Sequence, residues 1–139
     1  MRVTKRIEFD AGHRVARHGG QCANPHGYRY FVDLTVEGPL VDDDAAADYG
    51  MVVDFGRLKN FLTTQVHDRY DHGFMVEDAD TEMRDALTGH DWKVIVVPWT
   101  PTAENLAQAI GRDAGILRPM RVVSVTVFET PTSSATWTP

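Results

Sequence analysis

The stretch Tyr28-Arg-Tyr-Phe-Val-Asp-Leu-Thr-Val36 carries the strongest strand pattern in the chain. Its residues fall into two alternating sets: Tyr28, Tyr30, Val32, Leu34 and Val36 against Arg29, Phe31, Asp33 and Thr35. A period of two is typical of a strand that buries one face. His26 has the parity of Tyr28, so we expect both side chains to lie on the same face of this strand.

Three other segments predict strands that could pair with this one. Residues 2–9 and residues 123–129 also alternate between apolar and polar side chains. Val94-Ile-Val-Val97 is a short apolar run that ends at Pro98, which suits a buried strand. The sequence therefore predicts a sheet of four strands.

Two segments show the spacing of amphipathic helices. Asp54 can cap a helix that runs to about Val66, with Phe55, Leu58, Phe61 and Leu62 on its apolar side. Pro101 can begin a second helix that ends near Gly115. Residues 81–87 predict a third, shorter helix.

The remaining segments predict loops. Residues 11–25 are rich in glycine, residues 38–50 are acidic, and residues 130–139 are rich in proline, serine and threonine. The order of strands and helices predicts an α+β fold with mostly antiparallel strands, in one domain over residues 1–139.

Composition narrows the class of protein. The chain has 139 residues, a formal net charge of −6 and one cysteine. The negative charge argues against a general nucleic-acid binder, although a local basic pocket for a small anion remains open. No apolar run approaches the ~20 residues that cross a membrane. The N-terminus has no signal-peptide pattern, and a lone cysteine suits a reducing, cytoplasmic compartment.

Three residues that could carry chemistry fall within a short stretch: His13, Cys22 and His26. Cys22 is either a small buried thiol or a thiolate activated by a nearby base or cation. A catalytic zinc usually has three protein ligands and an open position. The third residue on the face of His26 is Tyr28, whose phenol is a poor zinc ligand unless the metal deprotonates it.

Two further sites carry carboxylates. Asp71 and His72 are adjacent, so we expect their side chains to pair either indirectly or in a turn. They are either a structural pair at a helix end or an acid–base pair for catalysis. Glu129 has the parity of the apolar residues before it, so it is either buried against a partner or already solvated. A ligand with two N–H groups in a row would satisfy a buried Glu129 through both oxygens.

Six motifs in order make the chain resemble the 6-pyruvoyltetrahydropterin synthase and 6-carboxytetrahydropterin synthase family. They span residues 3 to 130: Phe9-Asp-Ala-Gly-His13, Cys22-Ala-Asn-Pro-His26-Gly27, Gly50-Met-Val-Val-Asp-Phe55, Asp71-His72, Pro101-Thr-Ala-Glu-Asn105 and Glu129-Thr130. Each motif is weak alone, but their common order is hard to produce by chance.

The resemblance implies the tunnelling fold, a four-stranded antiparallel sheet with two helices on one face. It implies that the sheets of several copies join into a barrel, as a homohexamer of two trimers with active sites between subunits. It also implies 7,8-dihydroneopterin triphosphate as substrate. In the carboxy branch the products are 6-carboxytetrahydropterin, triphosphate and acetaldehyde, on the route to queuosine and other 7-deazaguanines.

The resemblance also implies a role for each matching residue. Glu129 would anchor the pterin, with Thr102 and Glu104 among the substrate-binding residues. Zinc on His13 and His26 would hold the side-chain hydroxyls of the substrate. Cys22 would shuttle a proton as a thiolate, with Asp71 and His72 as its acid–base partners.

The chain departs from the family pattern at Tyr28, where the family has a third zinc histidine. Tyr28 could bind as tyrosinate, His18 or His72 could take its place, or the site could bind zinc weakly or not at all. Three functions therefore compete: a carboxy-type synthase, a 6-pyruvoyltetrahydropterin synthase, and a pterin- or purine-binding relative without catalysis. We expect the carboxy type, because it is the commoner bacterial role.

Overall fold

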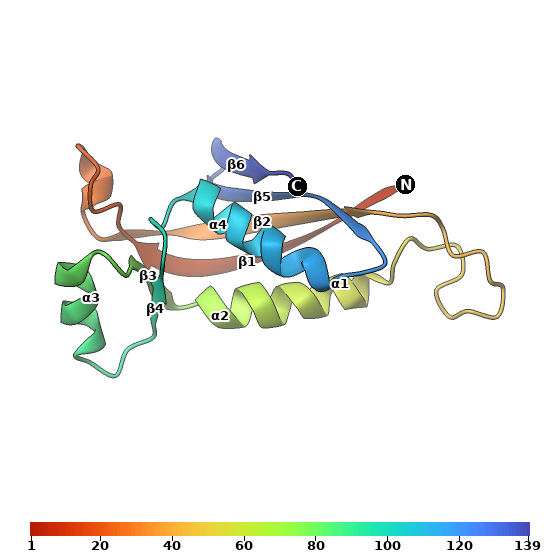
Figure 1. Cartoon of the computed structure of the whole chain (residues 1–139), viewed down its shortest axis with the longest axis horizontal. Helices are drawn as coiled ribbons and strands as arrows, with labels where there is room; N and C mark the ends of the chain where they lie inside the picture. Colours follow the sequence, from red (N-terminus) through yellow and green to blue (C-terminus); the bar gives the residue numbers. More distant parts are fainter.

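A six-stranded sheet forms the framework of the computed structural model, which describes residues 1–139 (Figure 1). The strand order is β4-β3-β1-β2-β5-β6. The strands are β1 (Arg2–His13), β2 (His26–Glu37), β3 (Gly73–Glu77), β4 (Val94–Val97), β5 (Arg121–Thr130) and β6 (Ser133–Trp137). Pairing is antiparallel from β1 through β2 and β5 to β6, whereas β3 and β4 add parallel to the other edge of β1.

The prediction of four strands was wrong, because β3 and β6 were missed. The apolar residues of β3 are consecutive and few, so no alternation marks it. β6 is rich in serine and threonine, and its pairing with β5 orders it. Hydroxyls of Thr126 and Thr136 bond across this pair at 2.8 Å. The Trp137 indole packs closely against Gly111, where an added Cβ would overlap the ring.

Helices cover one face of the sheet, as predicted. α1 (Phe55–Leu62), a π-helical turn (Thr63–His67) and α2 (Asp68–Tyr70) run on without a break, next to α4 (Ala103–Asp113) (Figure 1). The expected short helix is α3 (Thr81–Thr88), which lies beside β3 and β4 at one end of the molecule. A 3-10 turn at Gln21–Ala23 and another at Ala114–Ile116 complete the elements.

Side-chain caps fix where the two long helices begin. The Asp54 carboxylate accepts a hydrogen bond from the Gly56 N–H at 2.6 Å, as its predicted capping role requires. The Thr102 hydroxyl accepts one from the Asn105 N–H at 3.3 Å at the start of α4. Helix α4 therefore begins beside the end of β1, where the functional candidates gather. None of the helices is long and apolar enough to cross a membrane.

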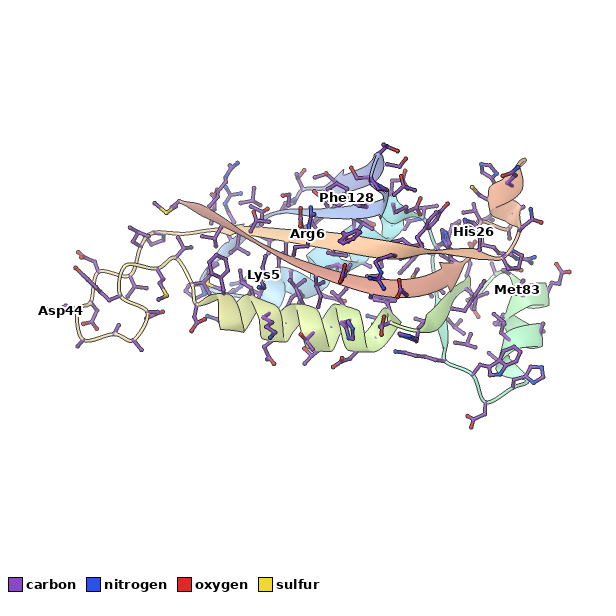
Figure 2. All side chains as sticks on the ribbon, turned by 180° about the vertical axis from the view of Figure 1, so that it is seen from behind. Lys5, Arg6, His26, Asp44, Met83 and Phe128 are labelled. Atoms are coloured by element: carbon purple, nitrogen blue, oxygen red, sulfur yellow. The ribbon has the colours of Figure 1, made fainter.

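The two faces of the sheet differ in chemistry. Alternate residues of β1 and β2 are buried under the helices, among them Phe9, Tyr30 and Val32. The opposite face is bare and carries pairs such as Arg6 and Asp33, with the Arg6 guanidinium 5.0 Å from the Phe128 ring centre (Figure 2).

Strand β1 extends further than the alternation predicted, through His13 instead of ending at Phe9. His13 is therefore a strand residue, and the register places it directly opposite His26. Gly27 makes this close pairing feasible, because a Cβ there would lie 2.7 Å from the Ala11 carbonyl oxygen. The acidic loop around Asp44 lies at the far end of the molecule from His26 (Figure 2).

Candidate active site

The pairing of β1 with β2 brings His13 and His26 together. Their ring centres are 4.5 Å apart. The Nδ1 atom of His13 is 2.5 Å from the Pro101 carbonyl oxygen, and the Nδ1 atom of His26 is 2.7 Å from that of Asn24. A carbonyl oxygen can only accept, so each Nδ1 must carry the ring proton and donate it. Each Nε2 of the neutral ring is then left with a free lone pair.

Both of these Nε2 atoms are buried and have no hydrogen-bond partner. Buried polar atoms are normally satisfied, so two adjacent exceptions call for an explanation. Histidine ligands of metals commonly donate one ring N–H to a carbonyl or carboxylate and coordinate through the other nitrogen. Burial also lowers the pKa of His13, which favours the neutral form that coordinates. The histidine pair therefore fits a metal ion.

A third ligand is less clearly provided. No group of three or more histidine, cysteine, aspartate or glutamate side chains is arranged to hold a metal. Tyr28 is one alternative, with its ring centre 5.6 Å from that of His13 and 5.3 Å from that of His26. Burial, followed by the charges of Glu129 and Cys22, raises the pKa of this phenol. Without a cation beside it, Tyr28 is thus protonated at neutral pH.

His18 is nearby but has its ring engaged. Its Nδ1 atom accepts a hydrogen bond from the Gly20 N–H at 2.9 Å. A neutral ring that accepts at Nδ1 carries its proton at Nε2, so it offers no free lone pair. Of the three histidines in this region, only His13 and His26 present buried nitrogens without a hydrogen-bond partner.

A pocket of about 160 Å³ adjoins the histidine pair. It is lined by almost all the predicted site residues: His13, Cys22, His26, Tyr28, Thr102, Glu104 and Glu129, together with Val15, His18 and Ala103. Segments from β1, β2, β5 and the start of α4 therefore contribute to one hollow. Cys22 lines the pocket from the 3-10 turn Gln21–Ala23. A hydrogen bond from the Val15 N–H to the Cys22 carbonyl oxygen (2.8 Å) helps to fix this turn.

Glu129 sits where the register of β5 with β6 shifts, between Phe128 and Thr130. Such bulges re-aim side chains next to active sites. One Glu129 carboxylate oxygen is 4.0 Å from the free Nε2 of His13. Burial, followed by the charge of Glu104, raises the pKa of Glu129. Of the two predictions for Glu129, the structure favours the partly buried carboxylate over the solvated one.

Asp71 and His72 lie outside this pocket. They pair directly in the turn between α2 and β3, where His72 has the left-handed φ of 56° and its Nδ1 is 2.6 Å from an Asp71 carboxylate oxygen. The Asp71 carboxylate also accepts from the Asp10 N–H at 3.0 Å, which is the main reason that its pKa is lowered. The His72 side chain is 81% exposed. In one chain, the structure does not bring this pair to Cys22.

Two residues near Asp71 were missed from the sequence. His67 has its Nε2 atom 3.6 Å from an Asp71 carboxylate oxygen. Lys93 donates to the carbonyl oxygens of Asp68 and Asp71, at 2.8 and 2.7 Å. The spacing of four between His67 and Asp71 was the available signal, since residues at i and i+4 share a helix face. Nothing in the sequence marks Lys93.

Known proteins resemble this chain over nearly its whole length. The family model described as 6-pyruvoyl tetrahydropterin synthase matches residues 2–139. A 6-carboxy-5,6,7,8-tetrahydropterin synthase of Rickettsia bellii is 33% identical over 136 residues, 94% of this chain and 95% of the relative. A probable 6-carboxy-5,6,7,8-tetrahydropterin synthase of Halobacterium salinarum is 37% identical over 133 residues, 93% of this chain and 81% of the relative.

Solved structures share the fold. An uncharacterized protein of Wolinella succinogenes superposes with a TM-score of 0.74 at 22% identity, covering 99% of this chain and 97% of that one. The 6-pyruvoyl tetrahydropterin synthase of Caenorhabditis elegans gives a TM-score of 0.68 at 21% identity, covering 100% and 95%.

Proposed function

This chain belongs to the 6-pyruvoyl tetrahydropterin synthase family, and we propose that it is a 6-carboxy-5,6,7,8-tetrahydropterin synthase, a carbon–carbon lyase. Its substrate would be 7,8-dihydroneopterin triphosphate, and its products 6-carboxytetrahydropterin, triphosphate and acetaldehyde. The pathway would be that of queuosine or another 7-deazaguanine. The observation that carries the proposal is the pocket in which two free histidine nitrogens, a thiol and a half-buried carboxylate meet.

Glu129 would bind the pterin ring. The ring presents a 2-amino group and the N3–H side by side, and a carboxylate can accept from both at once. Only the ionised carboxylate can do this with both oxygens, so the raised pKa of Glu129 ties binding to pH. Thr102 and Glu104 line the same pocket and would contact the ligand at its rim.

His13 and His26 would hold a zinc ion through their Nε2 atoms, with the Tyr28 phenolate as third ligand. When bound, the zinc would act as a Lewis acid toward the side-chain hydroxyls of the substrate. The carbonyl groups of Pro101 and Asn24 keep the two rings oriented by accepting from Nδ1. The approach of a metal cation would also reverse the raised pKa of Tyr28, because it favours the phenolate.

Proton transfer would need groups from two chains. The Cys22 thiolate would take the proton from the side-chain carbon of the substrate. Asp71 and His72 would serve a neighbouring subunit, because neither lines the pocket of its own chain and His72 is largely exposed. A homohexamer of two trimers, with sheets joined into a barrel, would bring the two parts together. The uncovered sheet face and the edge strands β4 and β6 are available for such assembly.

Product analysis tests the function. Purified protein is incubated with 7,8-dihydroneopterin triphosphate, and the pterin product, triphosphate and acetaldehyde are measured. We expect equal amounts of 6-carboxytetrahydropterin and acetaldehyde. Triphosphate release with a 6-pyruvoyl product and no acetaldehyde would instead identify the pyruvoyl branch. Retained pterin binding without any triphosphate release would identify a relative that only binds.

A further inference from the structure

The Asp71 carboxylate lies between two imidazole rings, only one of which belongs to the predicted pair. Its Oδ2 atom is 2.6 Å from His72 Nδ1 and 3.6 Å from His67 Nε2. Its Oδ1 atom accepts from the Asp10 N–H. The Asp10 N–H, followed by the two rings, lowers the pKa of Asp71 and holds its carboxylate in the ionised form.

A local irregularity of the helix lies directly before this arrangement. The π-helical turn Thr63–His67 closes with the Asp68 N–H bonded to the Thr63 carbonyl oxygen, five residues back. The extra residue rotates α2 relative to α1, and π turns of this kind occur frequently at functional sites. Three residues later, the bond from the Asp71 N–H to the His67 carbonyl oxygen at 2.8 Å has helical spacing. His67 and Asp71 are therefore i and i+4 neighbours on one face.

His67 is held between two carboxylates. Its Nδ1 atom is 3.2 Å from an Asp68 oxygen, while Nε2 faces Asp71. The 3.6 Å separation from Asp71 is longer than a hydrogen bond, so this contact is an ion pair that needs the protonated ring. The contact with Asp68 is a hydrogen bond that the ring can make through Nδ1. The other charged groups nearby are Asp10 and Arg29, which pair with each other, and Lys93, which binds backbone carbonyls. None of them contacts Oδ2 of Asp71.

We propose that His67 is a positioning residue for the Asp71–His72 pair and couples its own proton to that of His72 through the shared oxygen. This rests on the acid–base role proposed above for the pair. Two rings that share one carboxylate do not titrate independently. A protonated His67 partly neutralises the Asp71 charge that stabilises the protonated form of His72. His72 should therefore lose its proton more readily when His67 is protonated.

The direct test is the titration of His72 without substrate. Protein labelled with ¹³C-histidine is titrated by NMR as wild type, as His67→Asn and as His90→Asn. His90 is a matched control, because it is a loop histidine stacked on Trp92. We expect the midpoint of the His72 titration to move up by about 0.3–1 pH unit in His67→Asn and to remain at the wild-type pH in His90→Asn. An unchanged midpoint in His67→Asn overturns the proposal.

Turnover supplies a second readout, with His67→Gln as the informative variant. Glutamine restores an N–H donor toward Asp71 but never a charge. We expect His67→Asn to lower kcat about tenfold with KM unchanged within twofold, and His67→Gln to recover most of kcat while keeping the displaced pH profile. A kcat loss with an unmoved pH profile would mean that His67 is merely structural, against the proposal. If wild type has no turnover, only the proposed function fails, because the NMR titration still decides the coupling.

Discussion

At the scale of single residues, the hydrogen bonds of His13 and His26 decide what the pocket can bind. Each neutral ring donates its only N–H, at Nδ1, to a backbone carbonyl oxygen. The lone pair on each Nε2 atom is therefore free, and both Nε2 atoms are buried. The spacing of motifs identified these histidines. It could not reveal their tautomers, because the Pro101 carbonyl lies 88 positions away in sequence from His13. Tyr28 stands where a third nitrogen would be expected, and its contribution is open to measurement.

Replacing Tyr28 by phenylalanine removes the phenol and keeps the aromatic ring. If the phenolate completes the metal site, wild type should hold about one zinc per chain, and Tyr28→Phe well under half of that. Tyr49→Phe is the matched control, since Tyr49 is exposed in the acidic loop. Elemental analysis after gel filtration gives the metal content. Equal zinc in wild type and Tyr28→Phe would rule out the phenol as a ligand.

The raised pKa of Glu129 predicts how pterin binding depends on pH. As pH falls through this pKa, the carboxylate gains a proton and loses its ability to accept from two N–H groups. Affinity for neopterin should therefore fall at a higher pH than it would with an ordinary glutamate. Glu129→Gln should weaken binding about 100-fold and flatten its pH dependence. Calorimetric titration from pH 4 to 8 measures both.

A companion variant checks the cause of that pKa shift. Burial is the largest cause of the raised pKa of Glu129, and the Glu104 charge adds to it, so Glu104→Gln should move the decline in affinity part of the way toward lower pH. A decline at the same pH in both proteins would contradict the electrostatic explanation, which predicts a difference.

At the scale of elements, a salt bridge ties the end of β1 to the start of α3. Arg14 follows His13 directly and contacts the Asp80 carboxylate through two nitrogens, at 2.5 and 2.6 Å. The Asp80 side chain is only 5% exposed, and the same carboxylate accepts from the Met83 N–H to cap α3. This bridge fixes the point at which the site loop leaves the sheet.

Removing the cation leaves a buried carboxylate without its main partner. Arg14→Met should lower the free energy of unfolding by about 3 kcal/mol at pH 7. Arg14 lowers the pKa of Asp80, so the stabilisation is present above the ordinary aspartate pKa and disappears as pH falls through the lowered one. Urea denaturation at pH 7 and at pH 3 should therefore show a deficit that shrinks in acid.

The control for this prediction is Arg84→Met, which breaks the solvent-exposed pairs of Arg84 with Asp78 and Asp85. Exposed pairs contribute little, so its stability should match wild type. A similar loss in both variants would mean that burial of Asp80 is not the cause.

Helices and strands with a repeating hydrophobic pattern were predictable from the sequence. Those whose structure depends on contacts with distant parts of the chain were missed. The alternation of β2 and the spacing of α4 identified both elements. In β5 the pattern misled slightly: the register with β2 shifts after Thr35, so Val122 is buried in place of the predicted Val123. The π turn before Asp71 leaves no local signature, because helix spacing continues on either side of it.

At the scale of the whole molecule, the candidate site residues of one chain fall into two separate groups. The pocket contains the thiol and the histidine pair, while the Asp71–His72 pair faces outward elsewhere. The family resemblance implied sites between subunits, but it did not show which residues of one chain would lie apart. The order of residues in a sequence does not tell which pocket a side chain reaches. Under the proposed function, this separation would make activity depend on assembly.

Mixing two inactive variants tests whether sites are shared between subunits. Cys22→Ala and His72→Ala should each be nearly inactive as pure oligomers. Co-expressed at equal levels they should regain about a quarter of wild-type turnover, because random assembly pairs an intact Cys22 with an intact His72 at one site in four. Mixing the separately purified oligomers without exchange is the control. No recovery on co-expression would show that each site uses one chain only.

The close contact of Trp137 with Gly111 has a consequence for how this chain can evolve. Glycine within a helix costs about 1 kcal/mol relative to alanine, so drift toward a better helix former would be expected there. Any such change displaces the indole and with it β6, the outermost strand on that side of the sheet. Substitutions at Gly111 and Trp137 are therefore coupled in evolution. A larger residue at position 111 requires a smaller one at position 137, or β6 loses its place at the sheet edge.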